Sequence, residues 1–184
     1  MKELRYTLAT VNNKEFGGEL HFCNLLHDVF IFYFFTSTYK VLRVLQGSLQ
    51  SIRKNDLFGS PVYYANASGQ ISSFLDRAFY SGSAAFAYKP GAAVASCRRA
   101  GTTGTLDQLN KYFTINCMPV VSSQYWNMVH GNTPEEVVQD KEGLQIMRTL
   151  GSNMAWLLHC IQAGKEQGIA LPEREPKEKT NFIR

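Results

Sequence analysis

The chain has 184 residues, of which 45% are hydrophobic and 18% are charged, a composition that excludes disordered and fibrous proteins and suits one domain with a sizeable core. Its formal net charge of +4 is a mild excess without a basic stripe, so we expect no nucleic-acid partner. The most apolar run, Val29–Phe35, is shorter than the about 20 residues that a membrane helix needs, so we expect no membrane partner either.

Residues 1–55 contain no sharp motif. Within them, Val29–Phe35 is β-branched and aromatic, which predicts a buried strand. Apolar residues then recur at roughly helical spacing between Val41 and Ile52. A strand–turn–helix unit is therefore predicted in this atypical N-terminal segment.

Clearer patterns follow, beginning with Leu57–Phe58, which leads from a strand into a loop at Gly59–Pro61. Ser68 is the expected N-cap of a helix that continues to Tyr80, with its apolar residues on one face. A Gly- and Ala-rich loop then leads to Ala92–Cys97. This run is small and apolar, which is typical of a central strand covered on both faces.

The alternation of strands and helices continues to the end of this region. The expected elements are a loop at Arg98–Gly104, a helix at Leu106–Phe113, a strand at Met118–Ser122, a short helix opened by Thr133–Pro134, and a long amphipathic helix at Leu144–Ala163. Alternating strands and helices predict βαβ units and a mainly parallel sheet. We therefore expect one α/β domain over residues 56–171, followed by a charged, proline-interrupted arm or mobile tail over residues 172–184.

The four cysteines, Cys23, Cys97, Cys117 and Cys160, stand far apart, and no two have the C-x-x-C spacing of a zinc or redox site. No apolar signal-peptide segment follows the N-terminus. We therefore expect reduced thiols in a cytoplasmic protein without a metal site, the alternative being two disulfides in a secreted one.

Two loops follow strands of the predicted sheet, and ligands of open parallel sheets bind at the carboxyl ends of the strands. The first loop begins at Gly59 and offers backbone donors, the rings of Tyr63 and Tyr64, and the Asn66 amide. The second begins at Arg98 and offers guanidinium groups, hydroxyls and unhindered backbone N–H groups. Together they suit a flat, electron-poor ring with polar edges.

These loops resemble a known family, the flavodoxin-like NAD(P)H-dependent FMN reductases, and are most similar to its iron–sulfur-flavoprotein-like branch. The residues that carry the resemblance are Gly59-Ser60-Pro61-Val62-Tyr63-Tyr64, Gly69-Gln70, Ser73-Phe74-Leu75-Asp76-Arg77, Cys97-Arg98-Arg99-Ala100-Gly101-Thr102-Thr103, Tyr125-Trp126-Asn127-Met128-Val129-His130-Gly131 and Gly151-Ser152-Asn153-Met154-Ala155-Trp156. The resemblance runs from about Asp56 to the C-terminus. It implies a flavodoxin-like α/β fold, with a parallel sheet between helices and an atypical or incomplete N-terminal part.

The resemblance also implies FMN as the cofactor and NAD(P)H as a substrate. The residues implied to bind FMN are Ser60, Pro61, Val62, Tyr63, Tyr64 and Asn66 on the first loop and Arg98, Arg99, Ala100 and Gly101 on the second. Tyr125, Trp126 and His130 would lie near the site or at a subunit interface, because such proteins are usually homodimers or homotetramers. No side chain is expected to act as a catalytic acid, since the flavin performs the hydride transfer.

Two features of the family are missing from the sequence. Its Gly-Ser-Pro-Arg phosphate loop has only weak counterparts here, at Leu8–Lys14 and at Thr36–Thr38, the latter lying between the predicted strand and helix. The clustered cysteines of the iron–sulfur branch are also absent, so we expect no cluster. A replaced or rearranged N-terminal segment with low FMN affinity is one hypothesis.

The resemblance therefore implies an FMN-dependent NAD(P)H oxidoreductase that passes electrons through bound FMN to a quinone, flavin, azo or nitro acceptor. One alternative is a non-enzymatic FMN electron carrier, although such carriers are usually strongly acidic and this chain is not. The other is a degenerate paralogue with weak or no FMN binding, which the unusual first 55 residues favour.

Two further side chains allow more than one role. Cys97 is predicted to be an inert core thiol, because no histidine or acidic residue adjoins it to activate a nucleophile. His130 stands in a Gly–Asn loop, where it either protonates a reduced acceptor, contacts a nicotinamide, or makes an ordinary loop hydrogen bond.

Overall fold

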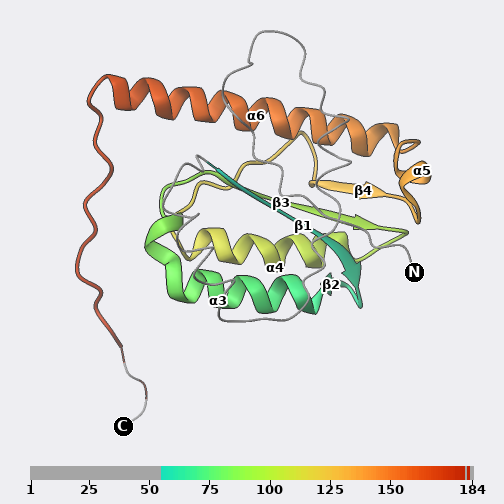
Figure 1. The fold of residues 1–184 in the computed structure, drawn as a ribbon, viewed down its shortest axis with the longest axis horizontal. Helices are drawn as coiled ribbons and strands as arrows, with labels where there is room; N and C mark the ends of the chain where they lie inside the picture. Colours follow the sequence, from blue (N-terminus) through green and yellow to red (C-terminus); the bar gives the residue numbers. More distant parts are fainter. Residues whose placement is uncertain (1–54, 181, 183–184) are drawn as a thin grey trace, which may run out of the picture.

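A computed structural model of the chain describes residues 55–180 and residue 182 (Figure 1). The strand predicted at Val29–Phe35, the helix predicted between Val41 and Ile52, and both candidate phosphate loops lie outside the described residues.

The described residues form a four-stranded sheet in the order β2-β1-β3-β4. Its strands are β1 (Asp56–Tyr63), β2 (Asn66–Ala67), β3 (Gly91–Cys97) and β4 (Met128–His130). The pairs β1–β3 and β3–β4 are parallel, whereas the short β2 turns back antiparallel against the end of β1. The three parallel strands therefore end at the same edge of the sheet, as predicted for a ligand-binding edge.

Helices cover both faces of this sheet, giving three layers (Figure 1). Helices α3 (Gly69–Phe86) and α4 (Thr102–Thr114) lie on one face, and α6 (Lys141–Glu166) lies on the other, after the short α5 (Pro134–Val137). In β3, Ala93 and Ala95 pack with the first pair of helices, while Ala92 and Val94 pack with α6. The prediction of a small-residue strand buried on both faces is confirmed.

Helix α3 is longer than predicted. The small residues after Tyr80 continue α3 to Phe86 instead of forming a loop, with non-helical torsions at Gly82. Phe86 is buried and stacks on Phe79, with ring centroids 4.1 Å apart. This contact extends the apolar face of the helix through a segment whose own composition predicts a loop.

The prediction of a strand at Met118–Ser122 is wrong. This segment makes only one isolated bridge, in which Val121 N–H donates to the carbonyl of Gly91 and Gly91 N–H donates to that of Pro119, each at 2.8 Å. The chain leaves the sheet after Val121 and returns as β4, which pairs with Ala95–Cys97. Pro119 has no N–H with which to extend the pairing, and the pairing stops after Val121. The regular strand beside β3 therefore forms later in the chain, as β4.

The end of the chain is an extended arm. Residues 169–180 have no regular secondary structure and are exposed, and Figure 1 shows them leaving the end of α6 and running away from it. The Tyr88 hydroxyl donates to the carbonyl of Pro172 at 3.4 Å, and the Arg174 guanidinium lies 5.3 Å from the Tyr88 ring centroid. Of the helices that the structure describes, none combines the length and apolar character needed to cross a bilayer.

Candidate functional site

The first predicted loop is mostly strand. Residues Gly59–Tyr63 belong to β1, and the loop is reduced to a tight turn at Tyr64–Ala65 between β1 and β2. Both turn residues have positive φ angles, 50° and 62°. Such two-residue hairpin turns normally use Asn or Gly, so the turn holds a strained backbone. It projects the Tyr64 side chain fully into solvent and leaves Tyr63 half exposed, at the carboxyl edge of the sheet.

Ser60 holds this hairpin in place. Its side chain is buried, and its hydroxyl donates to the carbonyl of Pro61 at 2.8 Å and accepts from Ser68 N–H at 2.9 Å. Ser68 in turn accepts from Ile71 N–H, which confirms it as the N-cap of α3. Both hydrogen bonds of the Ser60 hydroxyl are therefore made within the protein, while Pro61 and Asn66 beside it are exposed.

The second predicted loop is short and open. Arg98, Arg99 and Ala100 are exposed directly after the buried Cys97, and α4 begins at Thr102, four residues before the predicted start. Gly101 precedes α4 as its N-cap in a left-handed conformation, with φ at 95°. The next helical turn is anchored, because Thr105 N–H donates to the carbonyl of Gly101 at 3.2 Å.

The two loops touch at Gly101. A Cβ atom on this glycine would lie 2.8 Å from Val62 Cγ1 and 2.9 Å from Ala65 Cα. A second link joins β2 to α4, since Ala67 N–H donates to Gln108 Oε1 at 3.0 Å. The structure thus brings the turn after β1 and the loop after β3 into direct contact. We call the exposed aromatic and polar side chains of this region the carboxyl-edge site; they are Tyr63, Tyr64, Asn66, Arg98 and Arg99.

His130 ends β4 at the same edge of the sheet, opposite Cys97 in register. Asp140 holds it there: one carboxylate oxygen, Oδ2, accepts from His130 N–H at 2.7 Å and lies 3.6 Å from His130 Nδ1. The other oxygen accepts from Gly143 N–H at 2.9 Å and caps α6. The sequence analysis missed Asp140, although an aspartate before a helical pattern is an N-cap signal.

Tyr125 and Trp126 lie just before β4, at the end of the strand opposite to His130. They precede the strand, whereas His130 ends it, and they are about half exposed with ring centroids 4.8 Å apart. The structure therefore separates them from His130 along the edge strand.

Two groups, the Cys97 thiol and the Tyr112 hydroxyl, have pKa values above their ordinary ones. Burial raises the pKa of Cys97, against a smaller opposing effect of the backbone hydrogen bond with Arg99. Burial and the hydrogen-bonded Asp76 carboxylate raise the pKa of Tyr112. A raised thiol pKa disfavours the thiolate, which supports the interpretation of Cys97 as an unreactive core thiol.

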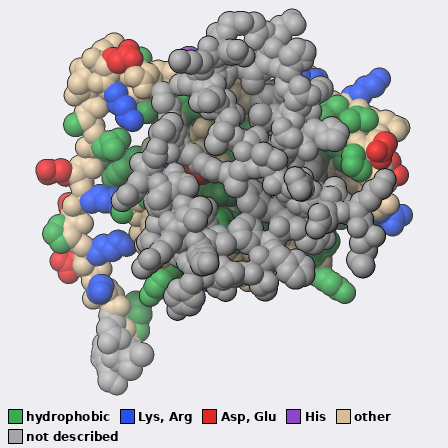
Figure 2. All heavy atoms as spheres, in the orientation of Figure 1, with side chains coloured by type: hydrophobic (Ala, Val, Ile, Leu, Met, Phe, Trp, Pro, Cys, Tyr) green, Lys and Arg blue, Asp and Glu red, His purple; other side chains and the backbone are tan. Residues whose placement is uncertain are grey.

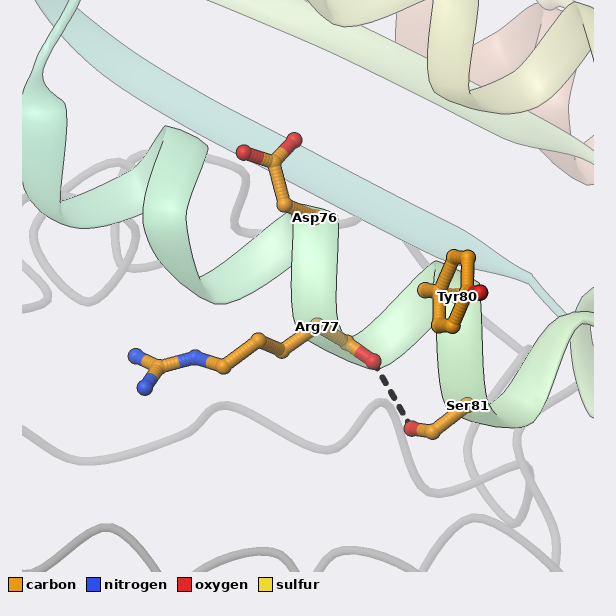
Figure 3. A pocket seen from close by; sticks show the side chains of 4 residues that line it. All are labelled: Asp76, Arg77, Tyr80 and Ser81. Atoms are coloured by element: carbon orange, nitrogen blue, oxygen red, sulfur yellow. Dashed lines mark hydrogen bonds between the residues drawn. The ribbon is translucent and has the colours of Figure 1, made fainter.

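A surface hollow on α3 is separate from the carboxyl-edge site. It is lined by Asp76, Arg77, Tyr80 and Ser81, and Figure 3 shows Asp76 and Arg77 pointing apart from one another. The Ser81 hydroxyl donates to the carbonyl of Arg77 at 2.7 Å, within the helix. No three His, Cys, Asp or Glu side chains converge as metal ligands among the described residues.

Replacing Asp140 by alanine is expected to destabilise the protein by about 2 kcal/mol, because the N-cap of α6 and the tether of β4 are lost together. Asp140→Asn should cost less, since asparagine is a good N-cap but has one acceptor oxygen fewer. Urea unfolding of both variants measures the difference. Equal stability of Asp140→Ala and the wild type would contradict the tether.

Comparison with known proteins agrees with this fold. A family model described as NADPH-dependent FMN reductase matches residues 12–133, so the likeness begins well before Asp56. An iron–sulfur flavoprotein of Methanocaldococcus jannaschii is 30% identical over an alignment of 119 residues, which covers 58% of this chain and 59% of that protein's length.

Two solved structures resemble the chain as well. A flavodoxin, WrbA-like protein from Agrobacterium tumefaciens has a TM-score of 0.53 at 22% identity, covering 62% of this chain and 71% of that one. The Trp repressor binding protein from Bacillus subtilis has a TM-score of 0.50 at 18% identity, covering 59% and 73%. These likenesses confirm the flavodoxin-like fold class.

Proposed function

Because the chain belongs to the NADPH-dependent FMN reductase family, we propose that it is an FMN-dependent NAD(P)H oxidoreductase whose flavin ring lies at the carboxyl-edge site. FMN as cofactor and NAD(P)H as substrate both fit the family description. The observation that supports the placement best is the contact of the turn after β1 with the loop after β3 at Gly101. It joins aromatic faces and cationic groups at one edge of a parallel sheet.

The residues at this edge have the chemistry that a flavin needs. Tyr63 and Tyr64 offer exposed aromatic faces for stacking, and Arg98 and Arg99 offer guanidinium donors for the oxygen atoms of the ring. Neither arginine has an ion pair among the described residues. Pro61, Val62, Asn66, Ala100 and Gly101 would complete the wall through backbone and amide groups. FMN, when bound, supplies the hydride chemistry.

Ser60 would act differently from its neighbours. Since its hydroxyl is engaged by Pro61 and Ser68, we propose that it positions the hairpin rather than contacting the cofactor. His130, tethered to Asp140 at the end of the next strand, would border the same edge.

We propose a flat, electron-accepting molecule as the final acceptor: a quinone, a free flavin, or an azo or nitro compound. The largely exposed edge, with a fully exposed Tyr64, supports access for such a molecule beside the cofactor. As further proposals, residues 56–171 form the flavodoxin-like domain, the protein is cytoplasmic, and it works as a homodimer or homotetramer.

A visible absorption spectrum of the purified chain, before and after adding FMN and then NADPH, tests the proposed function. We expect bound FMN, bleaching on addition of NADPH, and recovery of the colour in air with an added quinone. Bound FMN that NADPH does not reduce would favour the electron carrier. A chain that binds no FMN would overturn the proposal in favour of the degenerate paralogue.

A further inference from the structure

The arm that follows α6 has an unusual arrangement of charges. We define the arm as residues 172–180, whose sequence is Pro-Glu-Arg-Glu-Pro-Lys-Glu-Lys-Thr. All nine of its residues are exposed and none is in regular secondary structure. Figure 2 shows its basic and acidic side chains spread along the left side of the molecule.

Residues at equal distances on either side of Pro176 carry opposite charges. Counting outward from this proline, Glu175 mirrors Lys177, Arg174 mirrors Glu178, and Glu173 mirrors Lys179. Every mirrored pair joins opposite charges, and the three acids balance the three bases. In an antiparallel pair of identical segments related by a two-fold axis at Pro176, these mirrored residues lie directly opposite one another.

From this symmetry we propose that the arm pairs antiparallel with the arm of a second copy of this chain, with the two-fold axis at Pro176. In this register all six directly opposed pairs of charged residues join opposite charges, and none joins like charges. Directly opposed unlike charges stabilise an antiparallel pair, whereas opposed like charges destabilise it. The inference is independent of the proposed flavin chemistry.

The two prolines fit this register. Residues directly opposite in an antiparallel pair alternate between hydrogen-bonded and non-hydrogen-bonded positions. With Pro176 on the axis at a non-hydrogen-bonded position, Pro172, four residues away, falls at the same kind of position. Neither missing N–H is then needed, while Glu173, Glu175, Lys177 and Lys179 all supply backbone donors between the two arms.

Contacts at Tyr88 direct the arm. Its hydroxyl donates to the carbonyl of Pro172, and the Arg174 guanidinium lies over its ring, 5.3 Å from the centroid. A guanidinium can stack on an aromatic face and still donate from its edge, so this contact leaves Arg174 able to meet Glu178 of the other copy. A two-stranded ribbon alone is marginally stable, so we expect the paired arms to set the register and tighten a weak or broader association.

Charge-reversal variants test the proposal by sedimentation equilibrium at low ionic strength. One variant carries Lys177→Glu and Lys179→Glu, and the other carries Glu173→Lys and Glu175→Lys. Each turns four of the six cross-copy pairs into like charges, so each alone should self-associate roughly tenfold more weakly or worse. An equimolar mixture restores every pair to opposite charges, so it should associate at least as tightly as the wild type.

A control variant, with Lys141→Glu and Arg148→Glu on exposed positions of α6, makes outside the arm the same change in net charge as the variant with Lys177→Glu and Lys179→Glu. It should keep wild-type association. Because all the substituted side chains are exposed, circular dichroism of each variant should match the wild type. Wild-type association by both arm variants, failure of the mixture to recover, or a wild-type chain that is monomeric throughout the concentration series would each overturn the proposal.

Discussion

Replacing Gly101 by alanine is expected to weaken FMN binding by roughly 10- to 100-fold, because two penalties coincide at this residue. Its φ of 95° lies in a region that side chains rarely adopt. An added Cβ would also stand 2.8 Å from Val62 Cγ1 and 2.9 Å from the backbone of Ala65. The substitution should therefore push the turn after β1 away from the loop after β3. Fluorescence titration with FMN measures the affinity.

Two glycines serve as matched controls for this prediction. Gly168 has a positive φ of 80° with no atom near its added Cβ, so Gly168→Ala tests backbone strain alone. Gly69, at the start of α3, has open space and no positive φ, so Gly69→Ala tests the loss of a glycine alone. Both controls should retain FMN affinity. Unchanged affinity in Gly101→Ala would show that the contact of the two loops is irrelevant to the cofactor.

Replacing Arg98 and Arg99 together by glutamine should lower FMN affinity by about 100-fold or more while leaving stability almost unchanged. Both side chains are exposed, so the folded chain loses little when they are removed. Each charge-assisted hydrogen bond to a bound ligand is worth about 1.5–3 kcal/mol, which gives the expected loss. FMN titration and NADPH oxidation should fall together, since the cofactor is required for both.

The control is Arg148→Gln, which removes one exposed guanidinium from α6, away from the carboxyl-edge site. It should change neither FMN affinity nor activity. If the double variant lost stability but kept its FMN affinity, the two arginines would have a structural role and the flavin would have to bind elsewhere.

Several predictions of local structure are confirmed, and each rests on neighbouring residues. Ser68 caps α3 through Ile71 N–H, and Thr133 caps α5 through Glu136 N–H. The strand over Ala92–Cys97 forms because its small side chains allow helices to pack on both faces. A helix cap or a buried small-residue strand depends on a few adjacent residues, so it can be predicted from the sequence alone.

The errors arise where distant contacts decide the outcome. Phe86 belongs to α3 because it stacks on Phe79, although the residues between them are those of a loop. The fourth strand forms at Met128–His130 rather than at Met118–Ser122 because that is where the chain pairs with Ala95–Cys97. Neither contact leaves a signal within the segment concerned.

The residues of the candidate site show the same division. The sequence by itself determined the fold class, the aromatic and cationic residues of the two candidate loops, and the expectation that these loops share one edge of a parallel sheet. Only the tertiary structure decided that Gly101 touches Val62, that the Ser60 hydroxyl accepts a hydrogen bond from Ser68 N–H, and that Asp140 tethers His130. The physical reason is register: composition and periodicity select strands and helices, but atomic contacts between them depend on how neighbouring strands align.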